Sequence, residues 1–122
     1  MSPRRLLSIS ANPGLLLTRN DLLAVAGYSV ASPRHPEDAA LLFSKDHFNA
    51  VLIGDSVVPR LRAQIIHELR QMRPGIPIIY VYADARYASE PLADDCVDVT
   101  GTPEPLLNAI EAQLNRALPR AA

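Results

Sequence analysis

The sequence has one cysteine, one lysine and no long apolar run. Cys96 has no partner in the chain and cannot form an internal disulfide. Apolar runs such as residues 76–81 are far shorter than the roughly 20 residues needed to cross a bilayer, so no membrane insertion is expected. No N-terminal stretch combines a basic start, a long apolar segment and a small-residue cleavage site. We therefore expect a cytoplasmic protein.

The sequence also lacks an excess of charge of either sign. Twelve basic residues stand against 13 acidic ones, giving a formal net charge of −1. Neither a whole-protein field nor a set of aromatic stacking platforms is present to attract nucleic acid, so the domain is not expected to bind it by itself. The histidines lack the paired spacing of a zinc site, and the glycines form no phosphate-binding loop. We expect no metal and no cofactor.

What the sequence does contain is enough apolar material for one core. It has 122 residues, of which 48% are hydrophobic and 20% are charged, values typical of a globular protein. A chain of this length buries roughly two thirds of its unfolded surface around a single core. We therefore predict one domain that spans residues 1–122.

Strands and helices are predicted to alternate along the chain. Asn12 followed by Pro13 is a typical helix start, because Asn caps the first turn and Pro has no amide to leave unpaired. Gly27 is the natural left-handed stop of that helix. The predicted strands are residues 6–9, 28–31, 50–54, 76–81 and 96–100. The predicted helices are residues 13–26, one opening at 36–38, 61–72, and one from 102 through Leu118 that ends at Pro119.

This order of elements predicts an α/β fold. Short connections between successive strand and helix units require right-handed crossovers and a parallel sheet between two layers of helices. We expect a flavodoxin-like three-layer sandwich with a five-stranded parallel sheet in the order 2-1-3-4-5. That order brings the carboxyl ends of the first and third strands together, and Asp55 follows the third. Residues 83–95 have weak periodicity and leave room for only one short helix.

Five segments carry a resemblance to a known family. They are AGYSV (26–30), FNAVLIGDSVVP (48–59), GIPII (75–79), ADDCV (93–97) and TPEPLLNAI (102–110). In this order they resemble the receiver domains of bacterial two-component response regulators, over residues 6–118. An aspartate followed four residues later by proline accepts a phosphoryl group in that family, and Asp55 with Pro59 matches the spacing.

The other positions of the family's phosphorylation pocket do not match. Ser10 and Ala11 stand where the family has two acids that hold Mg²⁺, and Val99 stands where it has a lysine. Tyr82 stands where the family has a Thr or Ser that contacts the phosphoryl group. Cys96 stands where the family has an aromatic switch residue that responds to phosphorylation. One acid should bind Mg²⁺ poorly, and a pocket without metal and lysine loses most stabilisation of the transferring phosphoryl group.

The resemblance therefore implies a degenerate receiver domain without enzymatic activity. We expect a protein-interaction module in bacterial signal transduction that is not phosphorylated efficiently. The alternative is a phosphoacceptor receiver domain of a two-component phosphorelay, phosphorylated on Asp55. If it is not phosphorylated, Asp55 is expected to cap the turn toward Pro59.

Two surfaces are candidates for contact with a protein partner. The helix at residues 13–26 has more apolar residues than one inward face can hold. Leu16 and Leu23 are candidates for an interaction or homodimer face, with extra core contact as the alternative. The helix at residues 61–72 and its flanks carry several arginines, which we interpret as a solvated face, with a contact face for an acidic partner or nucleic acid as the alternative. A shortened or missing fourth helix would also change the surface that receivers commonly use for output.

Overall fold

The computed structural model describes residues 3–117 and contains one parallel sheet. Its strands are β1 (Arg5–Ile9), β2 (Ser29–Ala31), β3 (Ala50–Gly54), β4 (Ile78–Tyr82) and β5 (Asp95–Asp98). They lie in the order β2-β1-β3-β4-β5, and every neighbouring pair is parallel. The predicted sheet and its strand order are confirmed.

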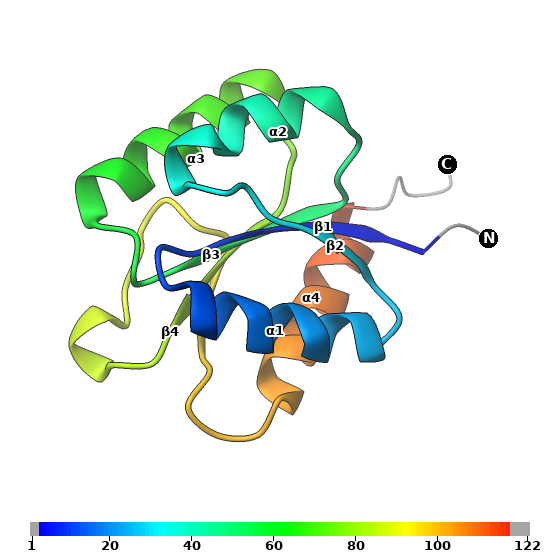
Figure 1. The fold of residues 1–122 in the computed structure, drawn as a ribbon, viewed down its shortest axis with the longest axis vertical. Coiled ribbons are helices and arrows are strands. Elements are labelled where there is room, and N and C mark those ends of the chain that lie inside the picture. The colour runs from blue at the N-terminus through cyan, green and yellow to red at the C-terminus, as the bar shows by residue number, and fades with distance from the viewer. Residues whose placement is uncertain (1–2, 118–122) are drawn as a thin grey trace.

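Helices cover both faces of the sheet. They are α1 (Pro13–Val25), α2 (Ala39–Lys45), α3 (Pro59–Met72) and α4 (Glu104–Ala117). Figure 1 shows α2 and α3 on one face and α1 and α4 on the other. The predicted three-layer sandwich is thus confirmed. The last predicted residues of the final helix, Leu118 and Pro119, lie outside the described residues.

Several element boundaries differ from the sequence prediction. β4 begins at Ile78, two residues late, because Pro77 has no N–H to donate to a strand ladder. The second helix opens with a 3₁₀ turn, η1 (Pro36–Asp38), before α2. α3 begins at Pro59 instead of residue 61. Proline suits this position because the first N–H groups of a helix have no acceptor within the helix, and proline has no N–H to leave unpaired.

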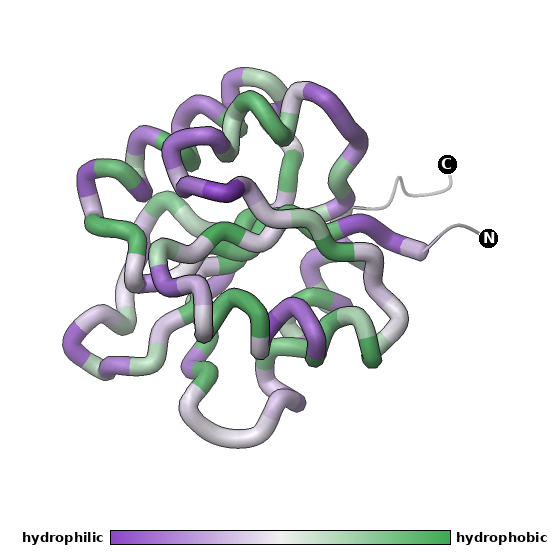
Figure 2. The backbone as a smooth tube through the Cα atoms, viewed as in Figure 1, coloured by the Kyte–Doolittle hydropathy of each residue, from purple (hydrophilic) through white to green (hydrophobic). Residues whose placement is uncertain are grey.

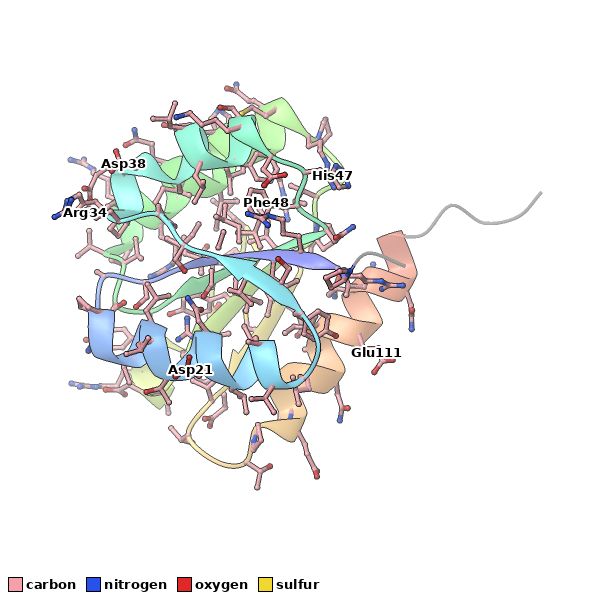
Figure 3. All side chains as sticks on the ribbon, turned by 45° about the vertical axis from the view of Figure 1, so that its right-hand side comes forward. Asp21, Arg34, Asp38, His47, Phe48 and Glu111 are labelled. Atoms are coloured by element: carbon pink, nitrogen blue, oxygen red, sulfur yellow. The ribbon has the colours of Figure 1, made fainter. Side chains whose placement is uncertain are left out.

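The sheet separates two hydrophobic clusters. Figure 2 shows apolar strands at the centre and more polar segments on the outer sides of the helices. The cluster under α2 and α3 includes Phe48, which Figure 3 shows between those helices and the sheet. The cluster under α1 and α4 is built from buried residues of four strands and two helices: Leu6, Leu23, Ala50, Leu52, Ile79, Val81, Val97, Leu106, Ala109, Ile110 and Leu114.

The ends of α1 form as the sequence predicts. The Asn12 side chain accepts a hydrogen bond from the Leu15 amide at 3.1 Å, which caps the first turn. Gly27 has a φ of +101°, a backbone conformation that residues with a Cβ rarely adopt. These two residues fix where α1 starts and stops, and therefore where its inward side chains meet the sheet.

The connection between β4 and β5 contains no α-helix. A single 3₁₀ turn, η2 (Ala85–Tyr87), stands there, so the prediction of a shortened or missing fourth helix is confirmed. The Asp84 side chain caps η2 by accepting a hydrogen bond from the Arg86 amide at 2.9 Å. The same arginine pairs with Asp84, and this hydrogen-bonded pairing lowers the pKa of the Asp84 carboxyl.

A buried ion pair anchors this connection to α3. Arg62 Nε lies 2.7 Å from Glu90 Oε1, and both side chains are only 7% exposed. Arg62 Nη1 donates to the Val57 carbonyl at 2.7 Å, and its guanidinium lies over the Tyr80 ring, 4.6 Å from the centroid. Glu90 Oε2 accepts from the Leu92 amide at 3.2 Å. The sequence predicted a solvated face for the arginines of α3, but Arg62 is buried in this ion pair and is not part of such a face.

No helix within residues 3–117 is both long enough and apolar enough to span a membrane.

Candidate functional site

Asp55 lies at the carboxyl edge of the sheet, directly after β3. Its amide donates to the Val81 carbonyl at 3.0 Å, which extends the pairing of β3 with β4 by one residue. Its side-chain Oδ2 accepts a hydrogen bond from the Ala83 amide at 3.0 Å. The carboxylate thus joins the ends of two strands. The expected cap on the turn toward Pro59 is wrong, because the hydrogen bond goes to the residue after β4.

Ser10 and Ala11, at the end of β1, take part in a hydroxyl network with Ser56. Ser10 Oγ and Ser56 Oγ are 2.9 Å apart, and the Ala11 amide donates to Ser56 Oγ at 2.9 Å. Ser10 Oγ also accepts from the Asn12 amide at 3.0 Å. This network ties the end of β1 to the turn after β3. Of the two positions that the resemblance assigns to metal-holding acids, Ser10 carries a neutral hydroxyl and Ala11 carries no polar side chain.

The donor set around Asp55 does not fit Mg²⁺. This hard cation is held by carboxylates and other oxygen ligands, and a site with one carboxylate and two serine hydroxyls supplies little charge to replace its waters. Within residues 3–117, no group of three or more His, Cys, Asp or Glu side chains is placed to hold a metal ion. Binding of Mg²⁺ at Asp55 is therefore not supported by this chain's own residues.

The structure places Val99 near Asp55 but directs two other candidate positions elsewhere. Val99 follows β5, its amide donates to the Tyr82 carbonyl at 2.9 Å, and its side chain lines a cavity together with Asp55. The Tyr82 ring stacks on Tyr80 with a centroid distance of 6.0 Å, on the α3 side of the sheet. Cys96 also packs on that side, where its Sγ donates to the Glu90 carbonyl at 3.7 Å.

Arg19 brings a positive charge to this edge that the sequence analysis missed. It belongs to α1, and its guanidinium packs against Gly54: a Cβ added to that glycine would lie 3.5 Å from Arg19 Nη1. Burial lowers the pKa of Arg19, while the nearby Asp55 carboxylate acts in the opposite direction. Its spacing from Leu15 and Leu22, four and three residues away, was the signal that it shares their helix face.

The proposed contact residues of α1 need one correction. Leu23 is fully buried against the sheet and belongs to the core, so it cannot mark an outward face. Leu16 is half-buried beside the turn after β3. The exposed apolar side chains of α1 are Leu15 at 51%, Leu17 at 66% and Val25 at 89%. Leu17 and Val25 remain as candidates for an outward contact surface, since Leu15 also lines a cavity at the edge of the sheet.

Comparison with known sequences gives no identification: no family model matches the chain, and no curated protein matches it. Solved structures do match. A CheY-like response regulator receiver domain from Methanospirillum hungatei JF-1 is 20% identical, with a TM-score of 0.81, over 95% of this chain and 97% of that one. A response regulator receiver protein from Sinorhizobium medicae WSM419 is 23% identical, with a TM-score of 0.79, over 95% and 98%.

A third match was solved in complex with Mg²⁺ and BeF. It is a response regulator protein from Thermotoga maritima, 18% identical, with a TM-score of 0.80, over 90% of this chain and 98% of that one. This chain therefore has the fold of response regulator receiver domains, and the resemblance carried by its sequence segments is confirmed at the level of the fold.

Proposed function

We propose that this chain is a single-domain, degenerate receiver that works as a protein-interaction module in bacterial two-component signalling. It acts in the cytoplasm, catalyses no reaction, and is not switched by efficient phosphorylation. The observation that carries the proposal is the hydrogen bonding of the pocket's side chains. The Asp55 carboxylate accepts from the Ala83 amide, and the Ser10 and Ser56 hydroxyls bond to each other at the end of β1, where the resemblance would place an acid that holds Mg²⁺.

One observation favours the alternative, a phosphoacceptor that is phosphorylated on Asp55. Arg19 supplies a cation near Asp55, although no lysine follows β5. Positive charge near a transferring phosphoryl group stabilises the transition state. A single arginine without a metal replaces only part of that stabilisation, and we therefore place this function second.

Titration with Mg²⁺ and beryllofluoride, followed by amide NMR, separates the two functions. We expect no saturable shifts at Asp55, Ala83 or Val99, because the site lacks the metal ligands that hold Mg²⁺. The Thermotoga maritima protein, solved in complex with Mg²⁺ and BeF, is the positive control. Saturable shifts around Asp55 that disappear in Asp55→Asn would contradict the proposal and favour the phosphoacceptor.

The outward side of α1 is proposed as the contact surface, with a second copy of the chain as a candidate partner. Sedimentation of Leu17→Glu against the wild type tests it, with Leu41→Glu as a control because Leu41, on α2, is 59% exposed. We expect self-association of the wild type to weaken at least tenfold, on the order of 1.4 kcal/mol, in Leu17→Glu only. A wild type that is monomeric at all concentrations would remove the homodimer.

A further inference from the structure

A cavity lies between α1 and the loop that joins β5 to α4. Its volume is about 300 Å³, and it opens at the same edge of the sheet as Asp55. In Figure 1 that loop passes beside α1 before α4 begins. Most of its wall is apolar, and the apolar lining residues are Leu15, Leu22, Ala83, Val99, Pro103 and Leu106. A cavity of this size is at the lower limit of small-molecule sites, which begin at about 300 Å³.

Two opposite charges lie in the wall of this cavity. Arg19 contributes a guanidinium whose Nη1 is buried and has no hydrogen-bond partner within residues 3–117. Nη1 itself is covered by the protein beside Gly54, but a guanidinium in the wall of a cavity can donate charge-assisted hydrogen bonds to a ligand oxygen, and these are stronger than hydrogen bonds between neutral groups. Asp55 contributes a carboxylate, which accepts from Ala83 through Oδ2 and lines the same cavity.

The two charges restrict the kind of molecule that fits. An anion such as phosphate would be attracted by Arg19 but repelled by Asp55. A cation would be attracted by Asp55 but repelled by Arg19. A neutral group that has both an acceptor and a donor can meet the two charges at once. The apolar wall then requires that the remainder of the molecule be hydrophobic.

We propose that this cavity binds a small uncharged molecule with an apolar body and a polar head that carries both a hydrogen-bond acceptor and a donor. The acceptor is an oxygen that receives a hydrogen bond from Arg19, and the donor faces Asp55. The apolar body lies against Leu22, Val99 and Leu106, between α1 and the start of α4. Such a ligand bridges two elements, so its binding supplies an input to the domain that needs no phosphoryl group.

The proposal rests on the proposed function, because a routinely phosphorylated Asp55 would not be free to face a neutral head. The two are tested separately. Saturable shifts at Asp55 on adding beryllofluoride would overturn the proposed function. If beryllofluoride causes no shifts and the ligand titrations below also show no binding, only the ligand site is overturned.

Amide NMR titration with hexanamide is the direct test, since a primary amide has an acceptor and a donor on an apolar chain. We expect saturable shifts at Leu22, Ala83, Val99 and Gly101, with a dissociation constant on the order of millimolar. Acetamide lacks the apolar body and hexanoate replaces the neutral head by an anion, so both should bind at least about tenfold more weakly. Hexanoate binding as tightly as hexanamide would overturn the neutral-head assignment.

Two variants test the residues that carry the site. Arg19→Met keeps an unbranched apolar stem but removes the charged donor, and should weaken hexanamide binding roughly tenfold or more. Val99→Phe fills the cavity and should abolish the shifts. Arg86→Met, which changes an exposed arginine on η2, is the matched control and should bind as the wild type does. Circular dichroism confirms that each variant is folded. Equal hexanamide binding in all three variants, or linear shifts without saturation, would overturn the proposal.

Discussion

Arg62→Met is expected to destabilise the fold by about 3–5 kcal/mol, because it leaves the Glu90 carboxylate buried without its partner. The substitution also removes the hydrogen bond from the Arg62 guanidinium to the Val57 carbonyl and the contact of that guanidinium with the Tyr80 ring. Natural domains are stable by only about 5–15 kcal/mol, so this one change removes a large share of the total. For a chain of this length the melting temperature should fall by roughly 10–20 °C.

The measurement is urea unfolding followed by circular dichroism, with matched variants on the same helix. Arg70→Met removes the pair between Arg70 and Asp94, whose side chains are 32% and 36% exposed, and should cost about 0–1 kcal/mol. The double variant Arg62→Met/Glu90→Leu removes both buried charges, and it should be more stable than Arg62→Met alone. An Arg62→Met variant that loses no more stability than Arg70→Met would show that the buried pair contributes little.

This ion pair also bears on the proposed function. The resemblance to receivers implies an output surface at the fourth helix, and here one 3₁₀ turn and an irregular segment replace that helix. Glu90 holds the segment to α3, and Asp94 adds a second link by accepting from the Ile78 amide at 2.7 Å. A segment held by one buried ion pair and further hydrogen bonds has one favoured arrangement, which supports the proposed interaction module over a two-state switch.

The fold could be predicted from the sequence because its signals are local. Asn12, Pro13 and Gly27 fix the ends of α1 through the backbone chemistry of single residues. The continuous apolar run of β3 identifies a strand buried on both faces, and in the structure all five of its residues are buried. Right-handed crossovers between such strands then leave few possible arrangements. The strand order followed from these elements together with the order that is common in flavodoxin-like sheets.

The site was less predictable because its contacts join residues far apart in the chain. Glu90 lies 28 residues after Arg62, inside a segment without periodicity, and nothing local indicates that the two meet. Asp55 was recognised, but its hydrogen bond to Ala83 depends on the register of β3 and β4. Leu23 was a candidate for an interaction face with core contact as the alternative, and the structure places it in the core; the apolar residues of α1 are too many for one face, so their spacing alone did not decide between the two.

Restoring the missing pocket residues is the prediction with the largest expected effect on chemistry. The variant Ser10→Asp/Ala11→Asp/Val99→Lys supplies two carboxylates beside Asp55 and one cation at the end of β5. With Mg²⁺ present, we expect phosphorylation by acetyl phosphate to accelerate on the order of 10³-fold over the wild type, because metal and lysine supply several kcal/mol of transition-state stabilisation. Intact-protein mass spectrometry measures the modified fraction over time.

The controls separate the pocket from its nucleophile. Adding Asp55→Asn to the restored variant should abolish the modification, and omitting Mg²⁺ should return the rate to the wild-type level. Ser10 is only 8% exposed, so a carboxylate there is costly without the metal, and the restored variant should be stabilised by Mg²⁺ where the wild type is not. A wild type modified on Asp55 as fast as the restored variant would contradict the electrostatic argument, because Arg19 alone would then suffice as the cation for phosphoryl transfer.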